Sequence, residues 1–129
     1  MLPFQIQFKP GQTVYGQVVY GAKKAIVSGL LRPADRFPSV RQLSQELKIN
    51  PNTAHKVVSA LIDEGLLEVL PGVGTVVAKS PAPNRAARRE LLSNEVERVV
   101  VEALKLELEL DDVTSAVAQT WQRITKAKL

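Results

Sequence analysis

The chain has 129 residues, a mass of 14.1 kDa and a formal net charge of +4, so it holds one ordinary domain or a small domain with an appendage. It contains no cysteine, which excludes disulfide bonds, thiolate zinc sites and cysteine nucleophiles. No apolar run approaches the ~20 residues that cross a bilayer. The first residues also lack the pattern of a signal peptide, so we expect a cytoplasmic protein that does not contact a membrane.

The positive charge is confined to one part of the chain. Residues 1–80 carry nine Lys or Arg against five Asp or Glu, a net charge of +4, whereas residues 81–129 carry eight of each. The two prolines of the Lys79–Asn84 segment interrupt any helix or strand between these parts. We therefore expect a domain at 1–80, a linker at 81–84 and a tail at 85–129. A basic domain attracts phosphates, although a charge of +4 is also a common solubility feature.

A first helix is predicted from about Thr13 to Ser28, with Gly29 as its end. Gly16 and Gly21 each cost ~1 kcal/mol inside a helix, and one of them is expected to allow close packing against a neighbour. The apolar residues that recur at helical spacing are Val18, Ala22, Ala25 and Ile26.

Two short helices follow in tandem. Ser39 begins the first of them, and Gln42 three residues later completes a capping box. After a turn at Lys48 and Ile49, Asn50 caps the next helix and Pro51 takes its first position. Gly65 predicts the end of this helix. The apolar faces are Val40, Leu43 and Leu47 on the first, and Ala54, Val57, Val58 and Leu61 on the second.

Two strands are predicted next, at Leu66–Leu70 and at Thr75–Ala78, because these runs are apolar and rich in β-branched residues. Pro71–Gly74 forms a tight tip between them and completes a β-hairpin. The fold class is therefore mainly α with a small β-wing (α+β): an N-terminal winged helix-turn-helix followed by a helical tail.

Polar residues crowd the start of the helix that follows Asn50. Asn52, Thr53, His55 and Lys56 point away from the core, where unpaired amides and the helix dipole favour a phosphate. A recognition helix brings such residues to base edges in the major groove. Arg41, near the start of the preceding helix, can reach a phosphate or a base. On a single helix these residues would indicate a solvated face, but the tandem helices and the hairpin favour DNA.

The Leu31–Leu43 run, the Asn50–Thr53 segment and the Pro71–Thr75 tip resemble, in this order, the DNA-binding domain of the GntR family, over about residues 12–78. The short tail resembles that of the YtrA-like subfamily, whose members are dimeric bacterial transcription regulators, often of transporter operons. By this resemblance the DNA-contacting positions are Arg41, Asn50, Pro51, Asn52, Thr53, His55 and Gly72.

Three residues depart from the family pattern. Ala34 stands where glycine is usual, so the turn there is expected to avoid a positive φ. His55 stands where arginine is frequent, which argues against bidentate reading of guanine. Val73 occupies a wing position often held by a polar or basic residue, so minor-groove insertion by the wing is left open.

The tail carries an apolar stripe from Ala86 to about Leu108, and Asp111 is expected to cap a final helix. A two-helix hairpin of ~45 residues cannot bury these faces alone. They either fold back onto the winged domain or, as we favour, pair with a second chain. The expected dimerisation residues are Leu92, Val96, Val99, Val100, Ala103, Leu104, Val113, Val117, Trp121 and Ile124.

The sequence therefore predicts a homodimeric transcription regulator, in the first instance a repressor, that binds double-stranded DNA at an inverted repeat. Regulation through the Lys79–Asn84 hinge is a hypothesis, and a small-molecule effector at a subunit interface stays open.

No cofactor and no metal site are expected, since His55 is the single histidine. An enzyme lacks support, because no catalytic constellation is evident. The alternative is a winged-helix module for protein–protein contacts in a larger assembly, which salt dependence would distinguish.

Overall fold

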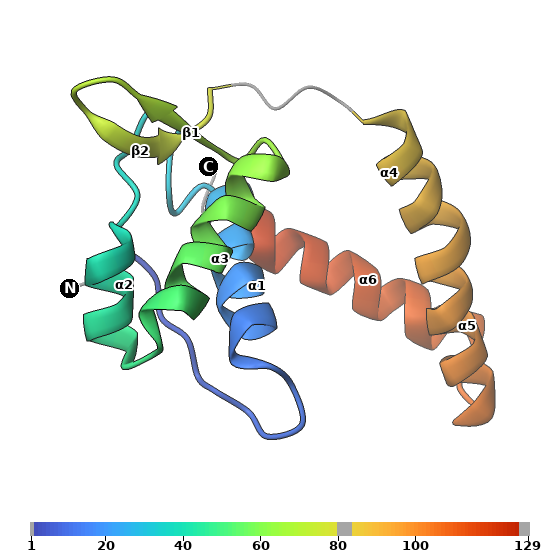
Figure 1. Ribbon diagram of the computed structural model, residues 1–129. Helices are drawn as coiled ribbons and strands as arrows, with labels where there is room; N and C mark the ends of the chain where they lie inside the picture. The colour runs from blue at the N-terminus through green and yellow to red at the C-terminus, as the bar shows by residue number, and fades with distance from the viewer. Residues whose placement is uncertain (1, 80–83, 127–129) are drawn as a thin grey trace. The chain divides into compact units, whose positions relative to one another are not determined.

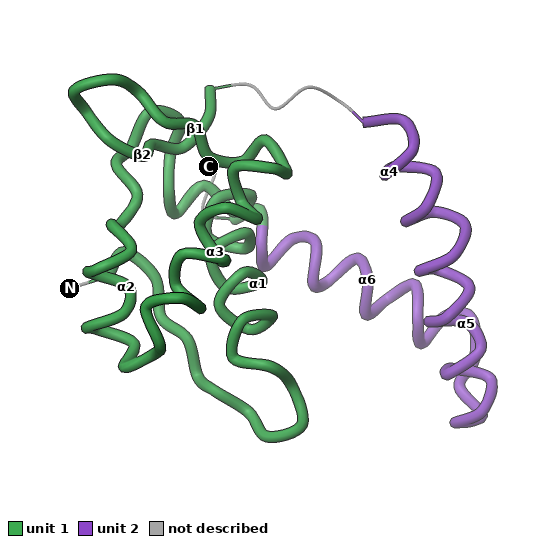
Figure 2. The backbone as a smooth tube through the Cα atoms, viewed as in Figure 1, with its two compact units in different colours: residues 1–81, 125–129 green, residues 82–124 purple. Residues whose placement is uncertain are grey.

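The computed structural model describes residues 2–79 and 84–126, which form two compact units (Figures 1 and 2). The first unit comprises residues 1–81 with 125–129, and the second comprises residues 82–124. The predicted linker at 81–84 lies outside the described residues except for Asn84. None of the described helices is long and apolar enough to cross a membrane.

Helix α1 (Val14–Val27) opens the first unit and agrees with the prediction to within one residue at each end. The Thr13 hydroxyl accepts a hydrogen bond from the Gly16 amide at 3.0 Å and so caps the first turn. Gly29 takes a φ of 85° and stops the helix in the left-handed conformation, as predicted.

The segment before α1 folds onto this helix. A Cβ placed on Gly21 would lie 3.0 Å from Cγ1 of Ile6, so the predicted close packing at a helical glycine is confirmed here. The Gln17 side chain binds the Lys9 backbone twice, accepting from its amide at 2.7 Å and donating to its carbonyl at 3.1 Å. Phe4 is buried as well. The N-terminal residues are therefore part of the folded unit.

Helices α2 (Val40–Leu47) and α3 (Pro51–Asp63) form the helix-turn-helix. The Gln42 amide donates to the Ser39 hydroxyl at 3.1 Å, which is the predicted cap of α2. Helix α3 packs against both α1 and α2, and Leu43, Ala54, Val57 and Leu61 are fully buried, whereas the predicted core residues Val40 and Leu47 of α2 are half-buried. Each ends at a residue with a left-handed backbone: Lys48 at φ 55° and Gly65 at φ 77°.

The wing is an antiparallel pair, β1 (Leu67–Leu70) and β2 (Gly74–Val77). Strand β1 begins one residue later than predicted and ends at the predicted Leu70, whereas β2 begins and ends one residue earlier than predicted. Leu70 pairs with Gly74. The Val73 amide donates to the Leu70 carbonyl at 3.1 Å, and Gly72 has a φ of 75°. Proline followed by a left-handed glycine is the sequence of a type II turn, which sets the shape of the tip.

A short segment, residues 34–37, lies along β2, where Arg36 forms an isolated bridge with Val76, and ties the wing to the start of α2. The Ala34 amide donates to the Val77 carbonyl at 2.9 Å, the Val77 amide donates to the Asp35 carbonyl at 2.8 Å, and the Phe37 amide donates to the Thr75 carbonyl at 2.9 Å. Phe37 in turn stacks on Phe4, with ring centroids 5.8 Å apart. Residues 34–37 therefore pair with β2 as a very short third strand.

Ala34 contradicts one prediction, because its φ is 73° rather than negative. The chain must turn sharply between Leu31, which is buried, and the segment paired with β2, and this geometry needs a left-handed residue. The Asp35 carboxylate accepts from the Arg32 amide at 2.8 Å and holds the turn closed. A left-handed alanine costs ~1–2 kcal/mol, which these hydrogen bonds offset.

The described part of the second unit is mainly helical. Helix α4 (Arg85–Glu90), the π-helical segment η1 (Leu91–Glu95) and helix α5 (Val96–Lys105) follow one another without a break. Helix α6 (Leu110–Thr125) comes after a turn in which Glu107 has a φ of 58°. The sequence predicted neither the π segment nor the end of the long helix at Lys105, three residues before the expected Leu108.

The predicted cap of the last helix is wrong. The carboxylate of Asp112, not that of Asp111, accepts from the backbone amide of Glu109 at 2.8 Å. The chain enters α6 at Leu110, so Asp111 already lies in the first turn. Asp112 lies in the first turn as well, at the third helical position, and binds back to the residue that precedes the helix.

The tail helices leave their apolar residues uncovered. Among residues 84–126 only Ala103 is buried. Leu92 and Trp121 are each 69% exposed, and Val113 and Ile124 are half-buried. The helical arm formed by α4, η1 and α5 and the arm formed by α6 therefore do not bury each other's apolar residues.

The left-handed alanine gives a testable prediction. Replacing Ala34→Gly removes the strain at φ 73°, so the free energy of unfolding should rise by about 1 kcal/mol, part of the gain being lost to greater freedom of the unfolded chain. The matched control is Gly72→Ala, at φ 75° with no atom within 4 Å of the added Cβ, which should lower it by about 1 kcal/mol. Urea unfolding at equal m-value measures both changes, and equal stability of Ala34→Gly and the parent chain would contradict the prediction.

Candidate nucleic-acid interface

The N-terminal end of α3 is built by Asn50. Its side-chain oxygen accepts from the Asn52 amide at 2.7 Å, and its carbonyl accepts from the Ala54 amide at 3.0 Å. Pro51 has no amide hydrogen, so Thr53 carries the one first-turn amide left without a partner among the described residues. The helix end therefore offers a ligand a single amide, and most of its binding capacity comes from side chains.

The predicted contact residues surround this helix end with free polar groups. Arg41, His55 and Lys56 are exposed, as are Asn50, Pro51 and Asn52, while Thr53 is half-buried. Within residues 2–79 and 84–126, no hydrogen bond or ion pair engages the side chain of Arg41, His55 or Lys56. Three nitrogen-bearing side chains are thus available to an anionic or hydrogen-bonding partner.

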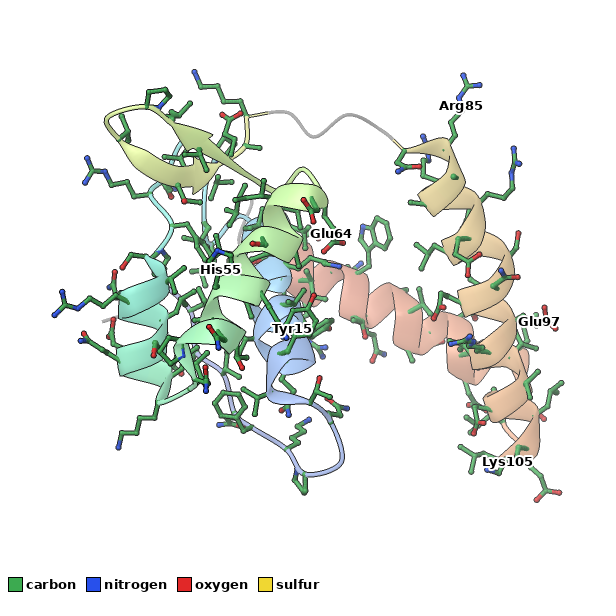
Figure 3. All side chains as sticks on the ribbon, viewed as in Figure 1. Tyr15, His55, Glu64, Arg85, Glu97 and Lys105 are labelled. Atoms are coloured by element: carbon green, nitrogen blue, oxygen red, sulfur yellow. The ribbon has the colours of Figure 1, made fainter. Side chains whose placement is uncertain are left out.

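An open groove of about 520 Å³ joins the outer face of α3 to the start of α1. It brings together three of the predicted residues, but Arg41, Asn50, Asn52 and Gly72 do not line it. Tyr15 and His55, which both line it, are labelled in Figure 3. The lining residues are Thr13, Tyr15, Thr53, His55, Lys56, Ser59, Ala60 and Asp63.

Tyr15 is the residue that sequence reasoning missed in this groove. It lies in the first turn of α1, 40% exposed, far along the chain from the α3 residues that it joins. No local pattern signals that contact, because it depends on how α1 packs against α3. A phenol hydroxyl at this place adds a neutral donor beside Lys56.

The wing presents a second exposed edge. Gly72 lies at its tip, and Val73 beside it is 45% exposed. Since β2 is hydrogen-bonded to residues 34–37, which lead into α2, the wing and Arg41 are linked through the backbone. The backbone therefore connects the wing tip to the start of α2, but the side chains of these two regions do not line a common pocket.

Metal binding has no support in this geometry. Within the two described ranges, no group of three His, Asp or Glu side chains could hold a metal ion. The interface consists instead of exposed polar side chains on a convex helix and hairpin.

Three helices, of which the third has an exposed polar face, and a β-hairpin wing define the winged helix-turn-helix class. This class is the scaffold of DNA-binding regulators. The family described as bacterial regulatory proteins, gntR family, matches residues 14–77, and the chain belongs to this family through that domain. It is a family of regulatory proteins, in agreement with the expectation that the chain is not an enzyme.

Known relatives extend the match into the tail. The chain is 27% identical over 108 residues to the HTH-type transcriptional repressor YtrA of Bacillus subtilis, which covers 83% of each protein. Its fold matches a transcriptional antiterminator of Listeria monocytogenes (20% identity, TM-score 0.82, 95% of this chain and 92% of that one). It also matches a transcriptional regulator from Oenococcus oeni (25% identity, TM-score 0.61, 90% of this chain and 97% of that one).

The helix cap yields a prediction that concerns stability alone. Replacing Asn50→Ala should lower the free energy of unfolding by about 1 kcal/mol, because the Asn52 amide loses its acceptor. Asn50→Asp should keep the cap and nearly all of the stability, since aspartate is an equally good cap. Chemical unfolding of both variants tests this, and equal losses would show that the 2.7 Å bond is not what stabilises the helix end.

Proposed function

We propose that this chain is a homodimeric transcription repressor that binds an inverted-repeat operator, with α3 in the major groove and the wing along the backbone. The observation that carries the proposal is the set of exposed, unpaired side chains of Arg41, His55 and Lys56 around the capped start of α3. Similarity to the YtrA repressor over most of both chains supports the assignment as a repressor.

The residues have distinct roles in this proposal. Lys56 and Arg41 neutralise phosphates or donate to guanine, whereas Asn52 donates to and accepts from adenine. His55, placed in the groove beside Thr53, donates to a base acceptor. The Asn50 oxygen is occupied by its own helix, so this residue acts on DNA only through its remaining amide donors. Pro51 and Gly72 contribute shape at the helix start and the wing tip.

The tail provides the dimer contact. Valines of α5 are largely exposed, with Val99 at 51% and Val100 at 44%, and Leu104 is 68% exposed. Burying a side chain of this size from water is worth about 1.5–3 kcal/mol, so a second copy gains much by covering the stripe. Two-fold pairing would present two copies of α3 to half-sites ~10 bp or a multiple apart.

The remaining parts of the proposal concern cellular context. We place the protein in the cytoplasm, where its DNA target lies, and a transporter operon is the target class that family resemblance suggests. Selection of bound fragments from genomic DNA tests that target class. A small-molecule effector would act by changing the dimer, and thermal stabilisation by candidate ligands would reveal it.

Loss of the Arg41 cation should weaken DNA binding. Replacing Arg41→Ala is expected to lower affinity for a selected operator by about 1–3 kcal/mol if the side chain contacts a base edge, with lower discrimination at one position. A uniform loss over all sequences, with a salt slope smaller by ~0.9, would instead assign it to a phosphate. Titration of labelled duplexes at several salt concentrations measures both quantities.

Arg123→Ala is the matched control, since it removes the same charge from α6 in the other unit. It should change affinity far less than the Arg41 variant. Equal losses would mean that net charge, not position, governs binding. Absence of any salt-dependent duplex binding by the parent chain would favour the protein-contact module over the regulator.

Dimerisation should depend on one face of α5. Replacing Val99→Glu is expected to shift the chain from dimer to monomer in light scattering, because it places a carboxylate on the apolar stripe. Affinity for a two-half-site operator should then fall by more than about tenfold, since linked half-sites no longer bind together.

Val101→Glu serves as the control, because Val101 lines a polar depression with Glu97, Arg98 and Glu102. This variant should remain dimeric. Monomers from both variants, or from neither, would contradict the assignment of the Val99 face to the dimer.

A further inference from the structure

Three arginines form a basic face at the start of the tail. Arg85, Arg88 and Arg89 lie on α4 at i, i+3 and i+4, a spacing that places them on one side of the helix. All three are exposed, and within the described residues no ion pair or hydrogen bond engages their side chains. Figure 3 shows the Arg85 side chain extending away from the ribbon at the start of α4.

This face is unfavourable for the helix that carries it. Like charges at i, i+3 and i+4 repel, and cations near a helix N-terminus oppose the helix dipole. Elsewhere on the same helical arm the cations have partners: Arg98 lies 3.7 Å from Glu95, and Lys105 lies 3.7 Å from Glu102. An uncompensated cluster of this kind favours a negatively charged partner, because a bound anion would relieve the repulsion.

The charge of the tail is strongly divided. Residues 90–129 carry eight acidic and five basic side chains, so the net positive charge of the tail is restricted to the three arginines. A counter-charged surface on a second copy of the tail is one conceivable partner. The arginines, however, directly follow the DNA-binding unit, and guanidinium groups match phosphate geometry with two donors at once.

Chain length permits contact with the same duplex. Arg85 follows Val77, the last residue of β2, by eight positions, which span at most ~28 Å. Once α3 and the wing are bound, a tethered basic face reaches a high effective concentration near the flanking backbone. The tether therefore favours phosphates over any partner that must arrive separately.

The π segment turns two of the three arginines away from the apolar stripe. In an uninterrupted α-helix, Arg85 and Arg89 would lie eleven and seven residues before Val96, and both spacings return to the same helical face. A π turn holds extra backbone and delays the helical phase by roughly 100°. Because η1 lies between α4 and α5, the side chains of Arg85 and Arg89 are rotated away from the face that carries Val96 and Val99.

We propose that Arg85, Arg88 and Arg89 bind phosphates of the duplex that flanks each half-site, as a clamp that adds affinity without reading sequence. This inference rests on the proposed function, since it assumes that the winged unit binds DNA. It extends the contact surface beyond the α3 and wing residues to the start of the tail.

The test uses the full chain and a triple variant, Arg85→Gln, Arg88→Gln and Arg89→Gln. A control variant, Arg98→Gln, Lys105→Gln and Arg123→Gln, lowers the formal net charge equally, from +4 to +1. Affinity is measured against salt concentration on two duplexes that share the selected operator, one ending at its edges and one extended on both sides. Circular dichroism and light scattering confirm that each variant is folded and keeps its oligomeric state.

The clamp predicts three results. The parent chain binds the extended duplex more tightly than the short one, and the arginine variant loses this preference. For the arginine variant, the slope of log affinity against log salt concentration falls in magnitude by ~0.9 for each phosphate contact removed, up to about 2.7 per chain. The control variant keeps the preference and nearly the full slope.

Two outcomes would overturn the inference while leaving the proposed function intact. One is an arginine variant with the parent's slope and duplex-length preference. The other is an arginine variant that becomes monomeric, which would assign the face to subunit contact. Failure of the parent chain to bind either duplex would instead count against the proposed function itself.

Discussion

The hydrogen bonds between residues 34–37 and strand β2 are the constraint on which the interface depends. They fix the wing against the segment that leads into α2, and Phe37 anchors the same segment in the core by stacking on Phe4. Helix α2 in turn packs on α3 through Leu43 and Leu61, both fully buried. The position of the wing tip relative to the start of α3 therefore follows from backbone pairing and core packing, not from any contact between the polar side chains.

This arrangement separates stability from recognition. Among residues 2–79 the buried side chains are apolar, and none of those described there is a buried polar or charged side chain. The residues proposed to contact DNA are exposed, apart from the half-buried Thr53, and make few interactions of their own. Substitutions among Arg41, His55 and Lys56 can therefore alter binding with little effect on folding. Asn50 is the exception, because its side chain serves the helix and the interface together.

Local chemistry explains what the sequence predicted well. The caps at Ser39 and Asn50, and the glycine at the end of α3, depend on neighbours within a few residues. The misjudged features depend on more distant partners or on backbone choices that residue type does not decide. Ala34 is left-handed because β2 holds it, and the groove at Tyr15 exists because α1 packs on α3. The π segment was not predicted, because helices are recognised in a sequence by a period of 3.6 residues and a π turn has a longer period.

The docked N-terminal segment has a practical consequence for dissecting the molecule. The family match begins at residue 14, yet Phe4 is 5% exposed, Ile6 contacts the helix at Gly21, and Lys9 is bound by Gln17. A fragment cut at the family boundary would lose these contacts, and removal of a buried phenylalanine alone costs about 3–5 kcal/mol. A DNA-binding fragment that keeps these contacts therefore has to include Phe4, about ten residues upstream of the start of the family match.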